Sequence, residues 1–179
     1  MKAYVISLKE RKDRRAKLYL PFDFELLLQE RLTGVIGIDW SLGNLGCMLG
    51  HRQAIQLAKD NGLNEVLVLE DDAEMTGELP ETMPYPITFL GGDFTADTLQ
   101  SGDIYTNILG THAVYYKNTV FDALLEQLPS LKELQTSNIP FMLEPYDIWL
   151  SKNGVGYVNA FKSFDETNSD ISHGKKNKR

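Results

Sequence analysis

The sequence has a single cysteine among its 179 residues, so it can form no intramolecular disulfide and no cysteine-rich metal cage. It also lacks any apolar run near the roughly 18–20 residues that a membrane-spanning helix needs. The apolar stretch at residues 4–8 is too short for the core of a secretory signal, and we therefore expect a cytoplasmic protein. A content of 42% hydrophobic and 24% charged residues excludes a disordered or fibrous chain. These properties predict one domain over residues 1–174 and a basic, disordered tail at 175–179.

Charge is distributed unevenly along the chain, although the formal net charge is only −7. Residues 1–17 carry seven basic and two acidic side chains, and the last five residues carry four basic ones. The acidic side chains are therefore concentrated in residues 18–174, and such a body repels a nucleic-acid backbone. We expect no nucleic-acid partner, and at most a weak peripheral contact of the basic tail with an anionic membrane.

Short apolar runs alternate with segments that favour helices. Strands are expected at residues 4–8, 65–69, 87–90, 112–116 and 155–158, with less certain ones at 24–28 and 35–38, and helices at 9–20, 44–61, 118–128 and 146–153. Residues 76–86 and 94–109 carry no clear periodicity and are expected to be irregular. This alternation predicts an α/β domain with a mostly parallel central sheet. Ligands of such sheets bind beyond the carboxyl ends of the strands.

An acidic triplet, Glu70-Asp71-Asp72, directly follows the apolar run at 65–69. Because side chains alternate along a strand, Glu70 and Asp72 should point the same way and Asp71 the opposite way. Two carboxylates on one side form a hard oxygen site that suits Mg²⁺ or Mn²⁺, held partly by substrate phosphates. The alternative interpretation is an acidic turn whose carboxylates cap the next element.

A phosphoacceptor receiver domain also opens with an apolar strand and an acidic pair, as residues 66–72 do. A receiver then needs a second buried strand ending in the acceptor aspartate and a later strand ending in lysine. Asp93 comes too early for the acceptor, and Asp97 and Asp103 follow polar residues. The receiver therefore remains the less favoured alternative.

Six segments, in order, carry a resemblance to a known family. They are YVISL at 4–8 followed by Arg11, Arg14 and Arg15, LGCMLGH at 45–51, LVLEDDA at 67–73, GTHAVYY at 110–116, PYDIWL at 145–150 and SDI at 169–171. Together they resemble glycosyltransferase family 25, the lipopolysaccharide and collagen galactosyltransferase-like enzymes. Gly50 stands where this family usually has serine, and the segment before Gly46 is shorter than in the family.

The resemblance implies a GT-A fold and a metal-dependent, inverting transfer of a hexose from a UDP-sugar. Galactose is the implied sugar, Mn²⁺ (or Mg²⁺) the implied cofactor, and a glycan or lipid-linked saccharide, as in lipopolysaccharide biosynthesis, the implied acceptor. Because the chain is compact, a nucleotide- or glycan-binding member without turnover is the alternative function.

Donor and metal roles fall on the first strand, the arginine-rich turn, the helix at 44–61 and the acidic triplet. The expected metal ligands are Glu70, Asp72 and His173, and the expected donor-binding residues are Ser7, Leu8, Arg11, Arg14, Arg15, His51, Arg52 and Asp71. Arginines placed after a strand end suit contact with phosphates, although each could equally lie on a helix surface. His51 could equally be a core histidine.

Inversion needs a base that takes the proton of the acceptor hydroxyl. The resemblance implies Asp147 for this role, with Asp93 as the second candidate and an N-cap as the structural alternative for Asp147. The expected acceptor-binding residues are Thr111, His112, Tyr146 and Trp149. Trp149 can alternatively be packed in the core.

Overall fold

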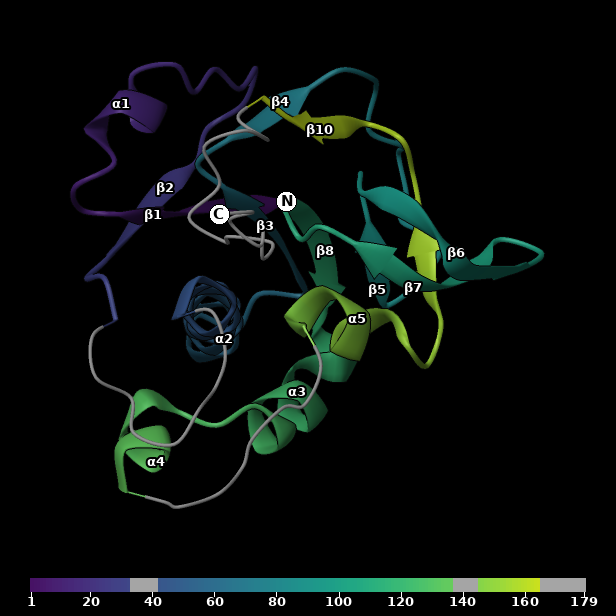
Figure 1. Ribbon diagram of the computed structural model, residues 1–179. Coiled ribbons are helices and arrows are strands. Elements are labelled where there is room, and N and C mark those ends of the chain that lie inside the picture. The colour runs from purple at the N-terminus through teal and green to yellow at the C-terminus, as the bar shows by residue number, and fades with distance from the viewer. Residues whose placement is uncertain (33–41, 137–144, 165–179) are drawn as a thin grey trace, which may run out of the picture.

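The computed structural model describes residues 1–32, 42–136 and 145–164. Its main sheet has eight strands in the order β2-β1-β3-β8-β5-β9-β7-β6 (Figure 1). The strands are β1 (Lys2–Leu8), β2 (Glu25–Gln29), β3 (Glu65–Glu70), β5 (Ile87–Phe89), β6 (Asp93–Ser101), β7 (Ile104–Leu109), β8 (Ala113–Lys117) and β9 (Val155–Tyr157). A second, two-stranded sheet pairs β4 (Ala73–Met75) with β10 (Phe161–Ser163) in antiparallel fashion.

The main sheet is mixed. Strands β2, β1 and β3 pair in parallel, β8 runs antiparallel to both β3 and β5, and β9 is parallel to β5. Strand β7 runs antiparallel to β9 and to β6. Among these described strands only β7 and β8 are therefore reversed, and the carboxyl ends of β3, β5 and β9 meet at the same edge. The α/β class is confirmed. Most of the described strands of this sheet point the same way, as expected of a mostly parallel sheet, but the two reversed strands make several neighbouring pairs antiparallel.

Strand β3 is buried on both faces, which explains its unbroken apolar run. Val66 and Val68 pack into one core cluster, whereas Leu67 and Leu69 pack into the other. The first cluster lies under helix α2 (Leu42–Asp60) and the second under the β4–β10 sheet (Figure 1). Burial on both sides is typical of central strands in α/β domains and holds the end of β3 in a fixed place.

Four further helices complete the described fold. They are α1 (Lys12–Arg15), α3 (Phe121–Gln127), α4 (Leu131–Thr136) and α5 (Tyr146–Ser151). A single turn of 3₁₀ helix at Asn118–Val120 directly precedes one of them, α3. Helices α2, α3 and α5 gather on the same side of the main sheet (Figure 1). None of the helices in the described part of the chain is both long and apolar enough to span a membrane.

Two predicted segments differ from the structure. The helix expected at 9–20 is only the single turn α1, because its arginine side chains turn back to the sheet and do not form a solvated helix face. The irregular segment expected at 94–109 is the hairpin of β6 and β7. Most residues of this hairpin are exposed, so its sequence needs no regular apolar alternation. Even Phe94, whose ring stacks on Tyr105, is 53% exposed. The strand expected at 35–38 lies outside the described residues.

Two glycines of α2 offer a matched test of its packing. A Cβ at Gly46 meets nothing within 4 Å, whereas a Cβ at Gly50 lies 2.8 Å from the Gln29 side-chain amide and 3.0 Å from Ile6 Cδ1. We expect Gly46→Ala to stabilise the protein by up to about 1 kcal/mol, because alanine favours helix. We expect Gly50→Ala to destabilise it by up to about 2 kcal/mol, because overpacking against Gln29 and Ile6 outweighs the same helix preference. Urea unfolding of both variants measures this, and equal effects would contradict the described packing of α2 on β1.

Candidate functional site

A cavity of about 500 Å³ opens where β3, β5 and β9 end. Its acidic lining comes from four places in the chain: Glu70 ends β3, Asp72 follows it, Asp93 begins β6 and Asp147 lies in the first turn of α5. The neighbouring strand β8 runs in reverse, so the residues before it reach the same edge. Carboxylates that converge on one cavity attract cations, and the cavity is therefore the candidate functional site.

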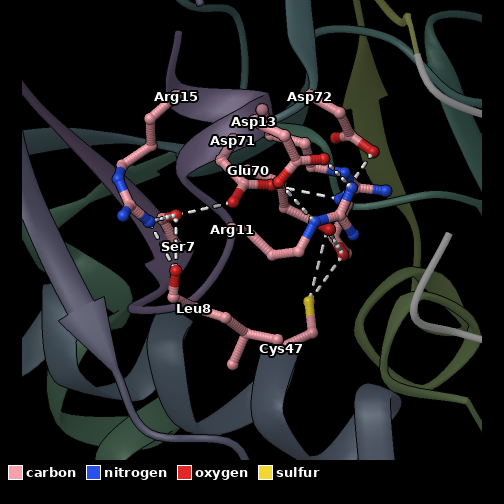
Figure 2. A network of polar contacts seen from close by, with 11 residues as sticks. Ser7, Leu8, Arg11, Asp13, Arg15, Cys47, Glu70, Asp71 and Asp72 are labelled. Atoms are coloured by element: carbon pink, nitrogen blue, oxygen red, sulfur yellow. Dashed lines mark hydrogen bonds and ion pairs between the residues drawn. The ribbon is translucent and has the colours of Figure 1, made fainter. Parts of the chain in front are cut away.

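A buried network of polar contacts joins the acidic triplet to β1 and α1 (Figure 2). Arg14 Nη1 lies 3.1 Å from Asp71 Oδ1 and 3.2 Å from Asp72 Oδ2, and all three side chains are less than a tenth exposed. Ser7 Oγ donates to Asp71 Oδ2 at 2.6 Å. Burial raises the pKa of Asp71, while the hydrogen bonds from Ser7 and Arg14 oppose that rise. Arg14 thus balances the charge of both aspartates.

The two carboxylate oxygens of Asp72 have different surroundings. Its Oδ2 faces Arg14, but its Oδ1 is buried and has no hydrogen-bond partner among the described residues. A buried carboxylate oxygen without a partner is costly, and a cation in the cavity would satisfy it. The donor set of this cavity therefore fits a hard divalent ion such as Mn²⁺ or Mg²⁺.

Glu70 lies on the floor of the cavity, where its hydrogen-bond donors are uncharged. Its Oε1 accepts a hydrogen bond from Thr111 Oγ1 at 2.7 Å and one from Cys47 Sγ at 3.4 Å. Burial, and next the charge of Asp72, raises the pKa of Glu70 to about 7. Glu70 and Asp72 both line the cavity, as the expected alternation has it, but Asp71 does not point away from Asp72, because both meet Arg14 Nη1.

His51 is a core residue that does not line the cavity. It is fully buried in α2, and its Nδ1 lies 2.8 Å from the Tyr116 hydroxyl. Burial lowers the pKa of His51 to about 3, so the ring is neutral near pH 7. A hydrogen bond with the Thr111 backbone opposes this fall in pKa, while no group among the described residues meets Nε2 with good hydrogen-bond geometry.

The arginine-rich turn is largely engaged with the protein itself. Arg15 donates to Ser7 Oγ at 2.7 Å and to the carbonyl oxygens of Leu8 and Lys9. Arg11 pairs with the exposed Asp13 at 3.0 Å. Arg52 donates to the carbonyl oxygen of Leu128 at 2.8 Å, away from the cavity. The contacts of Arg15 hold the end of β1 in place.

Asp147 is held by the backbone. Its Oδ2 accepts from the Gly110 N–H at 2.8 Å and its Oδ1 from the Ile148 N–H at 2.9 Å. Gly110 has φ 89°, a conformation that glycine adopts without strain. By contrast, the Asp93 side chain is exposed at the mouth of the cavity.

The expected acceptor residues divide between cavity and core. Thr111, His112 and Tyr146 line the cavity, and Tyr146 is itself buried with its hydroxyl 3.1 Å from that of Tyr116. Trp149 does not line the cavity, and its ring lies 6.2 Å from that of Tyr146 and under the Lys152 ammonium.

Of the expected site residues, the structure brings seven to the cavity, and nine others do not line it. The seven are Glu70, Asp72, Asp93, Thr111, His112, Tyr146 and Asp147, and the nine are Ser7, Leu8, Arg11, Arg14, Arg15, His51, Arg52, Asp71 and Trp149. His173 lies outside the described residues.

Several lining residues were not among the expected site residues. They are Asn44, Cys47, Asn159, Lys162 and Ser163. The last two belong to β10, whose pairing with β4 joins segments far apart in sequence. Asn44 and Cys47 lie in the first turns of α2. They come close to the end of β3 only through the packing of this helix on the sheet, which the sequence does not reveal.

The chain matches no family model and no curated protein. It resembles A197 from STIV at 10% identity over 91% of this chain and 84% of that chain, with a TM-score of 0.43. It also resembles a glycosyltransferase involved in the glycosylation of the major capsid of PBCV-1, at 10% identity over 76% and 69% of the two chains and a TM-score of 0.38. A third similar structure is mannose-1-phosphate geranyltransferase from Thermus thermophilus, at 14% identity over 90% and 76% and a TM-score of 0.37.

Removing Arg14 tests the buried network. We expect Arg14→Met to destabilise the protein by about 3–5 kcal/mol, because it leaves two buried carboxylates without their counter-charge. Arg31→Met is the matched control, since its pair with Glu10 is about half exposed on both sides and should be worth at most about 1 kcal/mol. Urea unfolding at pH 7 compares the two variants. Equal losses would contradict a buried, charge-balancing role for Arg14.

Proposed function

We propose that the protein is a metal-dependent glycosyltransferase that moves a hexose from a UDP-sugar to a glycan or lipid-linked saccharide. The observation that carries this proposal is the cavity at the strand ends, in which four carboxylates converge and Asp72 Oδ1 has no described partner. The ordered resemblance of the sequence to glycosyltransferase family 25 supports the choice of a sugar transferase over other metal-dependent enzymes. Galactose as the sugar, an inverting outcome, a role in lipopolysaccharide synthesis and a cytoplasmic location also belong to this proposal.

Asp72 and Glu70 would hold the divalent ion, with Asp72 as the principal ligand through Oδ1. When bound, the ion would supply Lewis-acid stabilisation of the charge that develops on the leaving diphosphate. Arg14 keeps Asp72 oriented from behind, because its guanidinium bonds the other oxygen. The proposed third ligand, His173, belongs to the segment beyond the described residues.

The acceptor hydroxyl must lose its proton as the new glycosidic bond forms. Asp93 is the better placed base, since its side chain is exposed at the cavity mouth. Both oxygens of Asp147 already accept backbone N–H groups, which suits a residue that holds the α5 terminus beside Gly110. Thr111 and His112 lie on the same wall and would contact the acceptor.

Metal-dependent donor binding tests this function. We expect a UDP-hexose with Mn²⁺ at about 100 times its dissociation constant to raise the melting temperature by about 5–10 °C. GDP-, CMP- and dTDP-sugars, or UDP-hexose with EDTA, should have little effect. Differential scanning fluorimetry over this panel measures the shift, and slow hydrolysis of the UDP-sugar separates an enzyme from a binding protein without turnover.

Asp72→Asn should abolish the shift, because the amide removes the anionic ligand while keeping its shape. Asp97→Asn makes the same change at an exposed position of β6 outside the cavity lining and should keep the full shift. A shift that survives Asp72→Asn, or that appears without metal, would overturn the metal assignment.

A further inference from the structure

A second cluster of metal-ligating atoms lies at the cavity floor, on the side away from Arg14. Cys47 and His51 are one turn apart on α2 and therefore share a face of the helix. Together with Glu70 they offer one sulfur, one nitrogen and one oxygen atom that all lie within 4.8 Å of one another. Cys47 and Glu70 line the cavity, so the cluster is reached from it.

The state of His51 points to a ligand at this cluster. The ring is fully buried, and its Nδ1 is engaged with the Tyr116 hydroxyl at 2.8 Å. The Thr111 backbone is the other contact of the ring, but no group among the described residues meets the buried Nε2 with good hydrogen-bond geometry, so this nitrogen is poorly satisfied. An outer hydrogen bond on one ring nitrogen is what usually fixes a histidine for metal binding through the other.

The donor atoms favour a softer ion than the site at Asp72. A thiolate, an imidazole and a carboxylate are ligands of zinc, which prefers four-coordinate tetrahedral geometry. In such a tetrahedron a sulfur and an oxygen ligand lie about 3.6 Å apart, and the distance from Cys47 Sγ to Glu70 Oε1 is 3.4 Å. Thr111 Oγ1 lies 3.0 Å from that sulfur and 2.7 Å from that oxygen, and so marks the side open to the cavity.

We propose that Cys47, His51 and Glu70 form a zinc site at the floor of the cavity, with Tyr116 as the outer partner that orients the histidine. Zinc replaces the thiol proton of Cys47 and any proton on Glu70, and these protons pass to the solvent. The site joins α2 to the end of β3. It shares Glu70 with the proposed donor-metal site but does not depend on the glycosyltransferase function.

Cobalt is the probe, because Co²⁺ occupies zinc sites and is coloured. The chain has only one cysteine, so a thiolate-to-cobalt charge-transfer band can come only from Cys47. We expect full-length, reduced protein to bind one equivalent of Co²⁺ with this band and with the strong visible absorption of tetrahedral cobalt. One equivalent of Zn²⁺ should bleach both. Absence of the charge-transfer band at saturating Co²⁺ would overturn the proposal.

Variants separate this site from the one at Asp72. Cys47→Ser and Cys47→Ala should lose the band, and His51→Gln should weaken cobalt binding at least tenfold, with circular dichroism confirming that each variant is folded. Tyr116→Phe should keep the band but weaken binding by about 10–100-fold. Asp72→Asn should keep the band while losing the UDP-sugar shift, so the two proposals fail separately. A band that is lost in Asp72→Asn but unchanged in His51→Gln would contradict the zinc site.

Discussion

Charge balance among converging carboxylates is the constraint on which this structure depends. The carboxyl ends of β3, β5 and β9 meet at one edge and bring several acidic groups to a single cavity. Buried like charges repel, and each also loses its hydration. Two features reduce this repulsion. Arg14 lies within ion-pair distance of both Asp71 and Asp72, and burial raises the pKa of Glu70, which favours its uncharged form. The remaining deficit is at Asp72 Oδ1, the atom that a cation would satisfy.

The mixed topology of the sheet places the polar partners of these carboxylates. Strand β8 runs antiparallel to β3, so the residues just before it return to the end of β3, and Thr111 meets Glu70 there. Helix α2, which packs on one face of the sheet, places Cys47 Sγ within hydrogen-bond distance of the Glu70 carboxylate. The segment before β8 and α5 are joined through the Gly110 N–H and the Asp147 carboxylate. Contacts between distant segments thus build the cavity around one strand end.

The α/β class and the place of the acidic triplet could be predicted from sequence, because β3 is a continuous apolar run that ends in carboxylates. The burial of Arg14 could not. In a run of charges an arginine is typical of a solvated helix, and its partner Asp71 lies 57 residues away. The hairpin of β6 and β7 was also hidden, since its strands are mostly exposed and do not alternate. The sequence allows His51 either a donor contact or a place in the core, and the structure buries it fully.

The central proposal is that Asp72 would hold a divalent ion, which would stabilise the diphosphate of a nucleotide-sugar. Anomalous diffraction from crystals grown with UDP and Mn²⁺ tests it most directly. The account predicts a manganese peak within coordination distance of Asp72 Oδ1, about 2.2 Å, with the diphosphate on its other side and Arg14 still on Oδ2. A nucleotide bound in the cavity without a manganese peak at Asp72, or a peak at another group with Oδ1 still unliganded, would contradict it.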